Sequence, residues 1–148
     1  MDTDAFEAVI APRIILCDRI IREEGTGKLS LIGCFEGFLS PTFPFQSIPF
    51  FVAVAITNIT AFPDQIDVVL RMQNTVGHVI ASSQAQLTKK PDAPPMPRHA
   101  NIDIVFPFGP VRFDTPGLYE LVCVVSKEEL AKRQFEVRPL TANPQQIQ

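Results

Sequence analysis

Hydrophobic and polar residues alternate in several stretches of the chain, as they do in β-strands that bury one face. The core-facing positions predicted this way are Ile66, Val68, Leu70 and Met72 in one stretch, and Ile102, Ile104, Phe106 and Phe108 in another. Residues 50–59 are apolar at nearly every position, which is typical of a central strand covered on both faces. Convincing helical periodicity is absent, so the pattern predicts an all-β protein.

Turn residues separate the expected strands at intervals of about 8–12 residues. Residues 14–22 and 28–39 flank Gly25-Thr26-Gly27 and predict a β-hairpin. Two proline-rich crossovers, 40–49 and 89–98, are longer than the short hairpins that join neighbours in a closed barrel. We therefore expect an immunoglobulin-like, two-sheet antiparallel β-sandwich of about eight strands. The remaining strands are expected at 77–88, 117–125 and 130–138.

A tyrosine after a Pro-Gly turn gives the most informative local signal. Pro116-Gly117 leads directly into an apolar strand, and Tyr119 is the only tyrosine of the chain. In immunoglobulin-like sandwiches a tyrosine at this place packs under the corner of a sheet and its hydroxyl bonds to nearby backbone. Gly117 and Tyr119 are therefore predicted to be structural residues.

The length of 148 residues favours one domain. The strand pattern places the sandwich at residues 12–138, with an N-terminal extension at 1–11. The polar residues 139–148 are expected to form a flexible tail.

Charge and cysteine usage limit the classes of partner. The net charge is −3 and no basic run occurs, which argues against nucleic-acid binding. The apolar runs are too short to span a bilayer, and the acidic N-terminus is not followed by a signal peptide, so we expect a cytoplasmic protein without a membrane partner. Three cysteines without CxxC spacing indicate neither a disulfide framework nor a zinc site. A pair between Cys17 and Cys34 would require neighbouring strands, and we do not expect it to be bonded.

Candidate catalytic motifs are weak. The segment Glu24–Ser30 resembles a phosphate loop, but its glycines are two apart and a strand follows, so a turn is expected. His78 is expected to face solvent, and neither it nor His99 has a catalytic partner nearby in sequence. We therefore expect no enzymatic activity and no cofactor or metal, although a cysteine or histidine centre assembled by the fold is an alternative.

Aromatic residues beside prolines are the best candidates for a binding site. They are Phe43, Phe45, Phe106, Phe108 and Phe113. We favour the interpretation that these rings close the open end of the sandwich, since aromatic residues commonly dominate cores. If they were exposed instead, they would form a partner interface or line a ligand pocket.

Two sets of motifs resemble an uncharacterised bacterial family of small all-β domains. The first is ILCD at residues 15–18 with GKLSLIGCF at 27–35, and the second is PGLY at 116–119 with FEV at 135–137. The resemblance covers most of residues 12–138. The family has no assigned activity, so the resemblance implies a small domain of unknown function and supplies no functional residues.

These observations favour a non-catalytic interaction or structural module that acts through protein–protein contacts. The partner is unknown, and self-association through an edge strand or an aromatic patch is one form that we consider. The alternative is a small-ligand-binding domain that uses the Phe/Pro-rich loop end.

Overall fold

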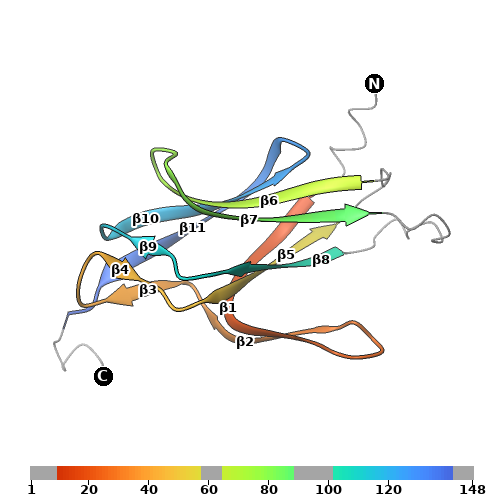
Figure 1. Cartoon of the computed structure of the whole chain (residues 1–148), viewed down its shortest axis with the longest axis horizontal. Helices are drawn as coiled ribbons and strands as arrows, with labels where there is room; N and C mark the ends of the chain where they lie inside the picture. The colour runs from red at the N-terminus through yellow and green to blue at the C-terminus, as the bar shows by residue number, and fades with distance from the viewer. Residues whose placement is uncertain (1–9, 58–64, 89–101, 142–148) are drawn as a thin grey trace.

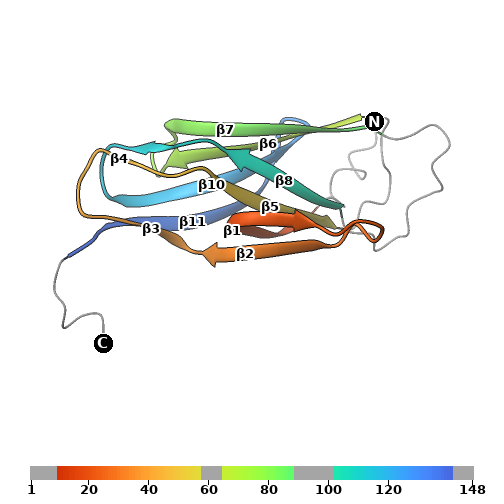
Figure 2. The same cartoon turned by 60° about the horizontal axis from the view of Figure 1, so that its bottom comes forward.

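The computed structural model describes residues 10–57, 65–88 and 102–141, which form strands and no helix (Figures 1 and 2). A four-stranded sheet consists, in spatial order, of β2 (Leu29–Phe35), β1 (Ile10–Arg22), β5 (Phe50–Thr57) and β8 (Ile102–Phe108). A five-stranded sheet consists of β3 (Gly37–Ser40), β11 (Glu128–Pro139), β10 (Gly117–Val125), β6 (Gln65–Asn74) and β7 (Val79–Thr88). The short strands β4 (Phe45–Gln46) and β9 (Arg112–Phe113) pair with each other. The prediction of an all-β protein is confirmed.

Strand count and strand direction differ from the expectation. The described residues form eleven strands rather than about eight, because β3, β4 and β9 are short and were not predicted. The expected single strand 28–39 divides at Glu36, so that β2 belongs to one sheet and β3 to the other. β3 runs parallel to β11, which contradicts the expectation of purely antiparallel pairing. The chain passes from one sheet to the other at Glu36, and this crossing places β3 beside β11 in the same direction.

Two glycines permit this path of the chain. Gly33 has a φ of +68°, and the Asp18 side chain occupies the space where a β-carbon would lie. Gly37 lies directly against β11, where a β-carbon would be 2.3 Å from the backbone oxygen of Glu136. Gly33 therefore supplies a left-handed conformation within β2, and Gly37 permits the close approach of β3.

Side chains of both main sheets form one hydrophobic core. The predicted alternation is confirmed in β6 and β8, whose core-facing residues are buried or, for Ile102, half-buried. β5 lies between β1 and β8, and its residues 52–56 are all buried, as expected of a central strand. The hairpin of β1 and β2 is also present, with the predicted antiparallel pairing.

Tyr119 lies at the corner where the chain enters β10. Its hydroxyl donates a hydrogen bond to the Thr115 carbonyl oxygen at 2.7 Å, the bond expected of a tyrosine corner. Its ring is 5% exposed, stacks on Phe135 and meets Phe113 edge to face. Gly117, two residues before it, has a φ of +145°. The hydroxyl thus satisfies a backbone acceptor while the ring fills the core.

The first and last strands extend slightly beyond the domain boundaries expected from the sequence. β1 begins at Ile10, inside the expected extension 1–11, and β11 ends at Pro139, the first residue of the expected tail. Residues 1–9 and 142–148, the 89–98 crossover and His99 lie outside the described residues. Among the described residues, no helix has the length and apolar character needed to cross a membrane.

Candidate interaction surfaces

Three of the five predicted aromatic residues, Phe45, Phe108 and Phe113, belong to a cluster of rings around Phe38, which the sequence pattern did not identify. Phe38 of β3 lies 6.1 Å from Phe45, 5.2 Å from Phe113 and 5.3 Å from Phe50, measured between ring centroids. Phe50 in turn stacks on Phe108 at 5.3 Å. The division of residues 28–39 into two strands directs Phe38 into the core, and a correct boundary at Glu36 would have identified it.

Packing in this core leaves little of the five predicted phenylalanines exposed for binding. Phe106, Phe108 and Phe113 are buried, whereas Phe43 and Phe45 are half-buried at its margin. This placement supports the interpretation that the rings close one end of the core. Ligand binding by these five residues stays a prediction, and none of them is an exposed side chain.

The glycine-rich segment between β1 and β2 is a hairpin turn, as predicted. The backbone N–H of Glu23 donates to the Lys28 carbonyl oxygen at 2.7 Å, and that of Gly27 donates to Glu23 at 2.9 Å. The backbone N–H of Lys28 donates to the Thr26 hydroxyl, and β2 follows at once. The loop therefore does not open a helix whose free N–H groups could hold a phosphate. His78 is exposed, as expected.

Cys17 and Cys34 are direct cross-strand partners in the β1–β2 pair. Cys17 is fully buried, while Cys34 is exposed. Burial raises the pKa of the Cys17 thiol, and the nearby Cys34 and Asp18 raise it further. Cys123 lies apart from this pair in the core, where burial raises its pKa to about 11. Among the described residues, no group of three or more His, Cys, Asp or Glu side chains could hold a metal ion.

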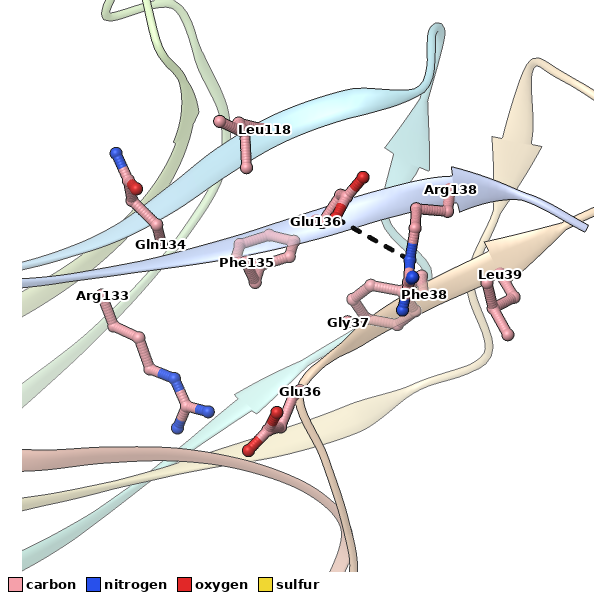
Figure 3. Close-up of a pocket in the computed structure, with 10 residues that line it drawn as sticks. All are labelled: Glu36, Gly37, Phe38, Leu39, Leu118, Arg133, Gln134, Phe135, Glu136 and Arg138. Carbon is pink, nitrogen blue, oxygen red and sulfur yellow. Dashed lines mark ion pairs between the residues drawn. The ribbon is translucent and has the colours of Figure 1, made fainter.

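A groove of about 520 Å³ lies along β3 and β11 on the five-stranded sheet (Figure 3). Gly37 lies in its lining, with Leu39 on one side and Leu118 on the other, and both leucines are about half exposed. The Glu136 and Arg138 side chains project beside it and form an ion pair at 3.8 Å. The lining thus combines apolar side chains with both signs of charge, which suits contact with an amphipathic surface.

The outer strands of the two sheets differ in how their free backbone edges are protected. On one side of the molecule lie β2, which contains the left-handed Gly33, and β3, which has only four residues. We call these two strands the guarded margin. On the other side lie β8, which contains Asp103 and Pro107, and β7 (Figure 2). We call β7 the open margin. Natural sheets limit edge-to-edge pairing with bulges, short strands, prolines and charges.

β7 has one register shift, between Val79 and Ala81, and otherwise carries none of these protective features. Its ten residues, VIASSQAQLT, include no charged residue and no proline. From Ala81 to Thr88 it pairs with β6 without interruption, so its backbone is regular along most of its length. From Ala81 to Thr88 its residues alternate between half-buried and exposed. Within the described part of the chain no strand pairs with the outer side of β7, so an uncharged row of backbone donors and acceptors lies at the end of the sheet.

Comparison with known proteins identifies the sequence family. A family model described as "Family of unknown function (DUF6941)" matches residues 12–138. A search of curated proteins gives no match. Two solved structures of a β-glucosidase from Listeria innocua, one in complex with isofagomine and one with glucose, are similar to 85% of this chain, with a TM-score of 0.42 and 12% sequence identity. The chain spans 16% of the β-glucosidase chain. A likeness of this degree says nothing about activity.

Proposed function

We propose that this chain, which belongs to the family of unknown function DUF6941, is a non-catalytic interaction module that acts through protein–protein contacts. The contact that we propose is antiparallel pairing of β7 with β7 of a second copy. The observation that carries the proposal is the uncharged edge of β7, which is regular from Ala81 to Thr88 and has no strand paired with its outer side among the described residues. Such an edge can extend a sheet by a further strand, because each added strand satisfies the free backbone groups.

The side chains of β7 also suit pairing with a second copy. If the two-fold axis passes through Ser83, Ala81 lies opposite Ala85 of the other copy, and Ser82 lies opposite Gln84. Residues of equal parity then share a face, so the half-buried residues of both copies continue one layer and the exposed residues continue the other. The pairs are small or polar and uncharged, so like charges do not oppose one another.

The proposal is completed by three expectations from the sequence. The fold is an immunoglobulin-like sandwich, which the Tyr119–Thr115 hydrogen bond supports. The protein acts in the cytoplasm, without a nucleic-acid or membrane partner. The partner surface is the sheet edge rather than the aromatic end, where Phe106, Phe108 and Phe113 are buried in the core.

Sedimentation velocity over a range of concentrations tests the proposal directly. We expect a monomer–dimer equilibrium of the full chain. A protein that is monomeric even at about 1 mM, where a contact of about 4 kcal/mol is half formed, would contradict it.

Two double variants locate the contact. In Ser82→Glu/Gln84→Glu, two glutamate pairs oppose each other across the axis, and each costs up to about 1 kcal/mol, so we expect dimerisation about thirtyfold weaker. In the matched control, Ser82→Glu/Gln84→Lys, each glutamate meets a lysine and the dimer is retained. Both variants share the change at Ser82, which lies beside Arg71 of β6. Equal dimerisation of the two variants would place the contact elsewhere and overturn the proposed pairing.

A further inference from the structure

The β1–β2 hairpin contains a pair of cysteines that takes no part in the proposed dimer contact on β7. Cys17 and Cys34 are opposite each other in the antiparallel register, so their side chains lie on the same face of the sheet. Cross-strand partners have Cα separations of about 4.5–5.5 Å, which lies within the range that a disulfide spans. The pair can therefore be bridged without a change of strand register.

The two thiols differ in access to solvent. Cys34 lies on β2, the outermost strand of its sheet, and its side chain is exposed. Cys17 lies on β1 between Cys34 and Phe51 of β5, and it is fully buried. A small oxidant from solvent therefore meets Cys34 first, while Cys17 is held beside it and shielded from the same reaction.

We propose that Cys34 and Cys17 form a reversible redox pair in which peroxide oxidises Cys34 and Cys17 resolves the product as an intramolecular disulfide. The oxidant is hydrogen peroxide or a related hydroperoxide. This site is separate from the β7 edge, so its test does not depend on dimerisation through that edge.

The chemistry balances in two steps. The Cys34 thiolate attacks one peroxide oxygen, the O–O bond breaks, and the departing hydroxide takes up a proton to leave as water, which gives a sulfenic acid at Cys34. Cys17 then loses its proton and its Sγ attacks Sγ of Cys34; the S–O bond breaks and the hydroxide leaves with that proton as a second water. Two thiols and one hydrogen peroxide thus give one disulfide and two waters, with two electrons passing from sulfur to oxygen.

The raised pKa of Cys17 is consistent with this division of roles. A buried thiol beside Asp18 resists ionisation, so Cys17 is a poor first nucleophile in the reduced protein. Once Cys34 carries a sulfenic acid, reaction with the adjacent sulfur needs only a small thiolate fraction because the two atoms are already held together.

Intact-mass and peptide analysis of the full chain tests the proposal. The reduced protein is treated at low concentration with one equivalent of hydrogen peroxide and then digested with trypsin. We expect the loss of two hydrogen atoms, a peptide of residues 14–19 linked to one of residues 29–71, and reversal by dithiothreitol. Cys123 remains a free thiol in the same sample, which serves as an internal control.

Single variants separate the two roles. Cys34→Ser, a change at an exposed position, abolishes the mass loss and leaves Cys17 reduced. Cys17→Ala retains oxidation but stops at the sulfenic acid, which dimedone traps on Cys34. Asp18→Asn removes a nearby negative charge and speeds disulfide closure severalfold; it also keeps the proposal testable if Cys17→Ala does not fold.

Three outcomes would each overturn the proposal. They are preferential oxidation of Cys123, a Cys34–Cys34 disulfide between copies as the main product, and no disulfide at all.

Discussion

The guarded margin and the open margin lie on opposite sides of the same pair of sheets, and their strands differ in length and in residue type (Figures 1 and 2). On the guarded margin, Gly33 disturbs β2 and the chain leaves the sheet at Glu36, after which β3 adds only four residues to the other sheet. On the open margin, β7 continues for ten residues without a charge or a proline. β7 therefore lacks the charges and prolines that commonly hinder edge pairing, whereas β2 is distorted at Gly33 and β3 is short.

The guarded margin depends on small residues at defined places rather than on propensity. Gly33 leaves room for Asp18, and Gly37 leaves room for the backbone of β11. β7 contains no glycine, and from Ala81 to Thr88 it pairs with β6 in an unbroken register. Substitutions at the glycines are therefore expected to change folding stability, whereas substitutions on β7 change association.

The largest effect on stability is expected from Gly37→Ala. The new β-carbon would lie 2.3 Å from the Glu136 carbonyl oxygen, and because that atom belongs to the backbone, β3 must move away from β11. We expect a loss of about 1–3 kcal/mol in the free energy of unfolding, measured by urea denaturation. Gly109→Ala is the matched control: Gly109 has open space around its β-position, so a change within about 0.5 kcal/mol is expected. Equal effects of the two substitutions would contradict the close approach of β3.

A smaller loss is expected from Gly33→Ala. An alanine at a φ of +68° costs about 1–2 kcal/mol in backbone strain, whereas the contact with Asp18 can be relieved by rotation of that side chain. We expect the loss in urea denaturation and faster amide hydrogen exchange in β2. The double variant Asp18→Ala/Gly33→Ala separates the two causes, because it removes the contact but not the strain. Full recovery of stability in the double variant would show that the backbone conformation of Gly33 contributes nothing.

These glycines also show how far the sequence predicts the fold. The strands that alternate cleanly, such as β6 and β8, are predicted with their buried faces, because that information is local. The split of residues 28–39 is missed because both halves are apolar and extended, and the change of sheet depends on contacts with β11, about a hundred residues later in the chain. Phe38 is missed for the same reason.

The candidate sites follow the same rule. Sequence patterns identified a strand at residues 77–88, but its position at the end of a sheet depends on the order of strands in space. The proximity of Cys17 and Cys34 follows from the register of a hairpin whose two strands were predicted, although their register was not. Local patterns therefore identify the elements, while exposed edges and neighbouring side chains require the assembled sheets.

The smallest expected effect gives the most selective comparison of the two margins. Gln84 on β7 and Ser30 on β2 are both exposed, and their partners on the adjacent strands are Val69 and Ile21. Gln84→Lys places an unpaired charge opposite Ser82 of the second copy, so we expect dimerisation to weaken by up to about fivefold, equivalent to about 1 kcal/mol. Ser30→Lys adds the same charge to the guarded margin and leaves dimerisation unchanged in sedimentation velocity.

Both variants should retain the unfolding free energy within about 0.5 kcal/mol, because neither position is packed in the core. If association weakened in Ser30→Lys but not in Gln84→Lys, the interface would lie on β2 and the proposed contact on β7 would be wrong.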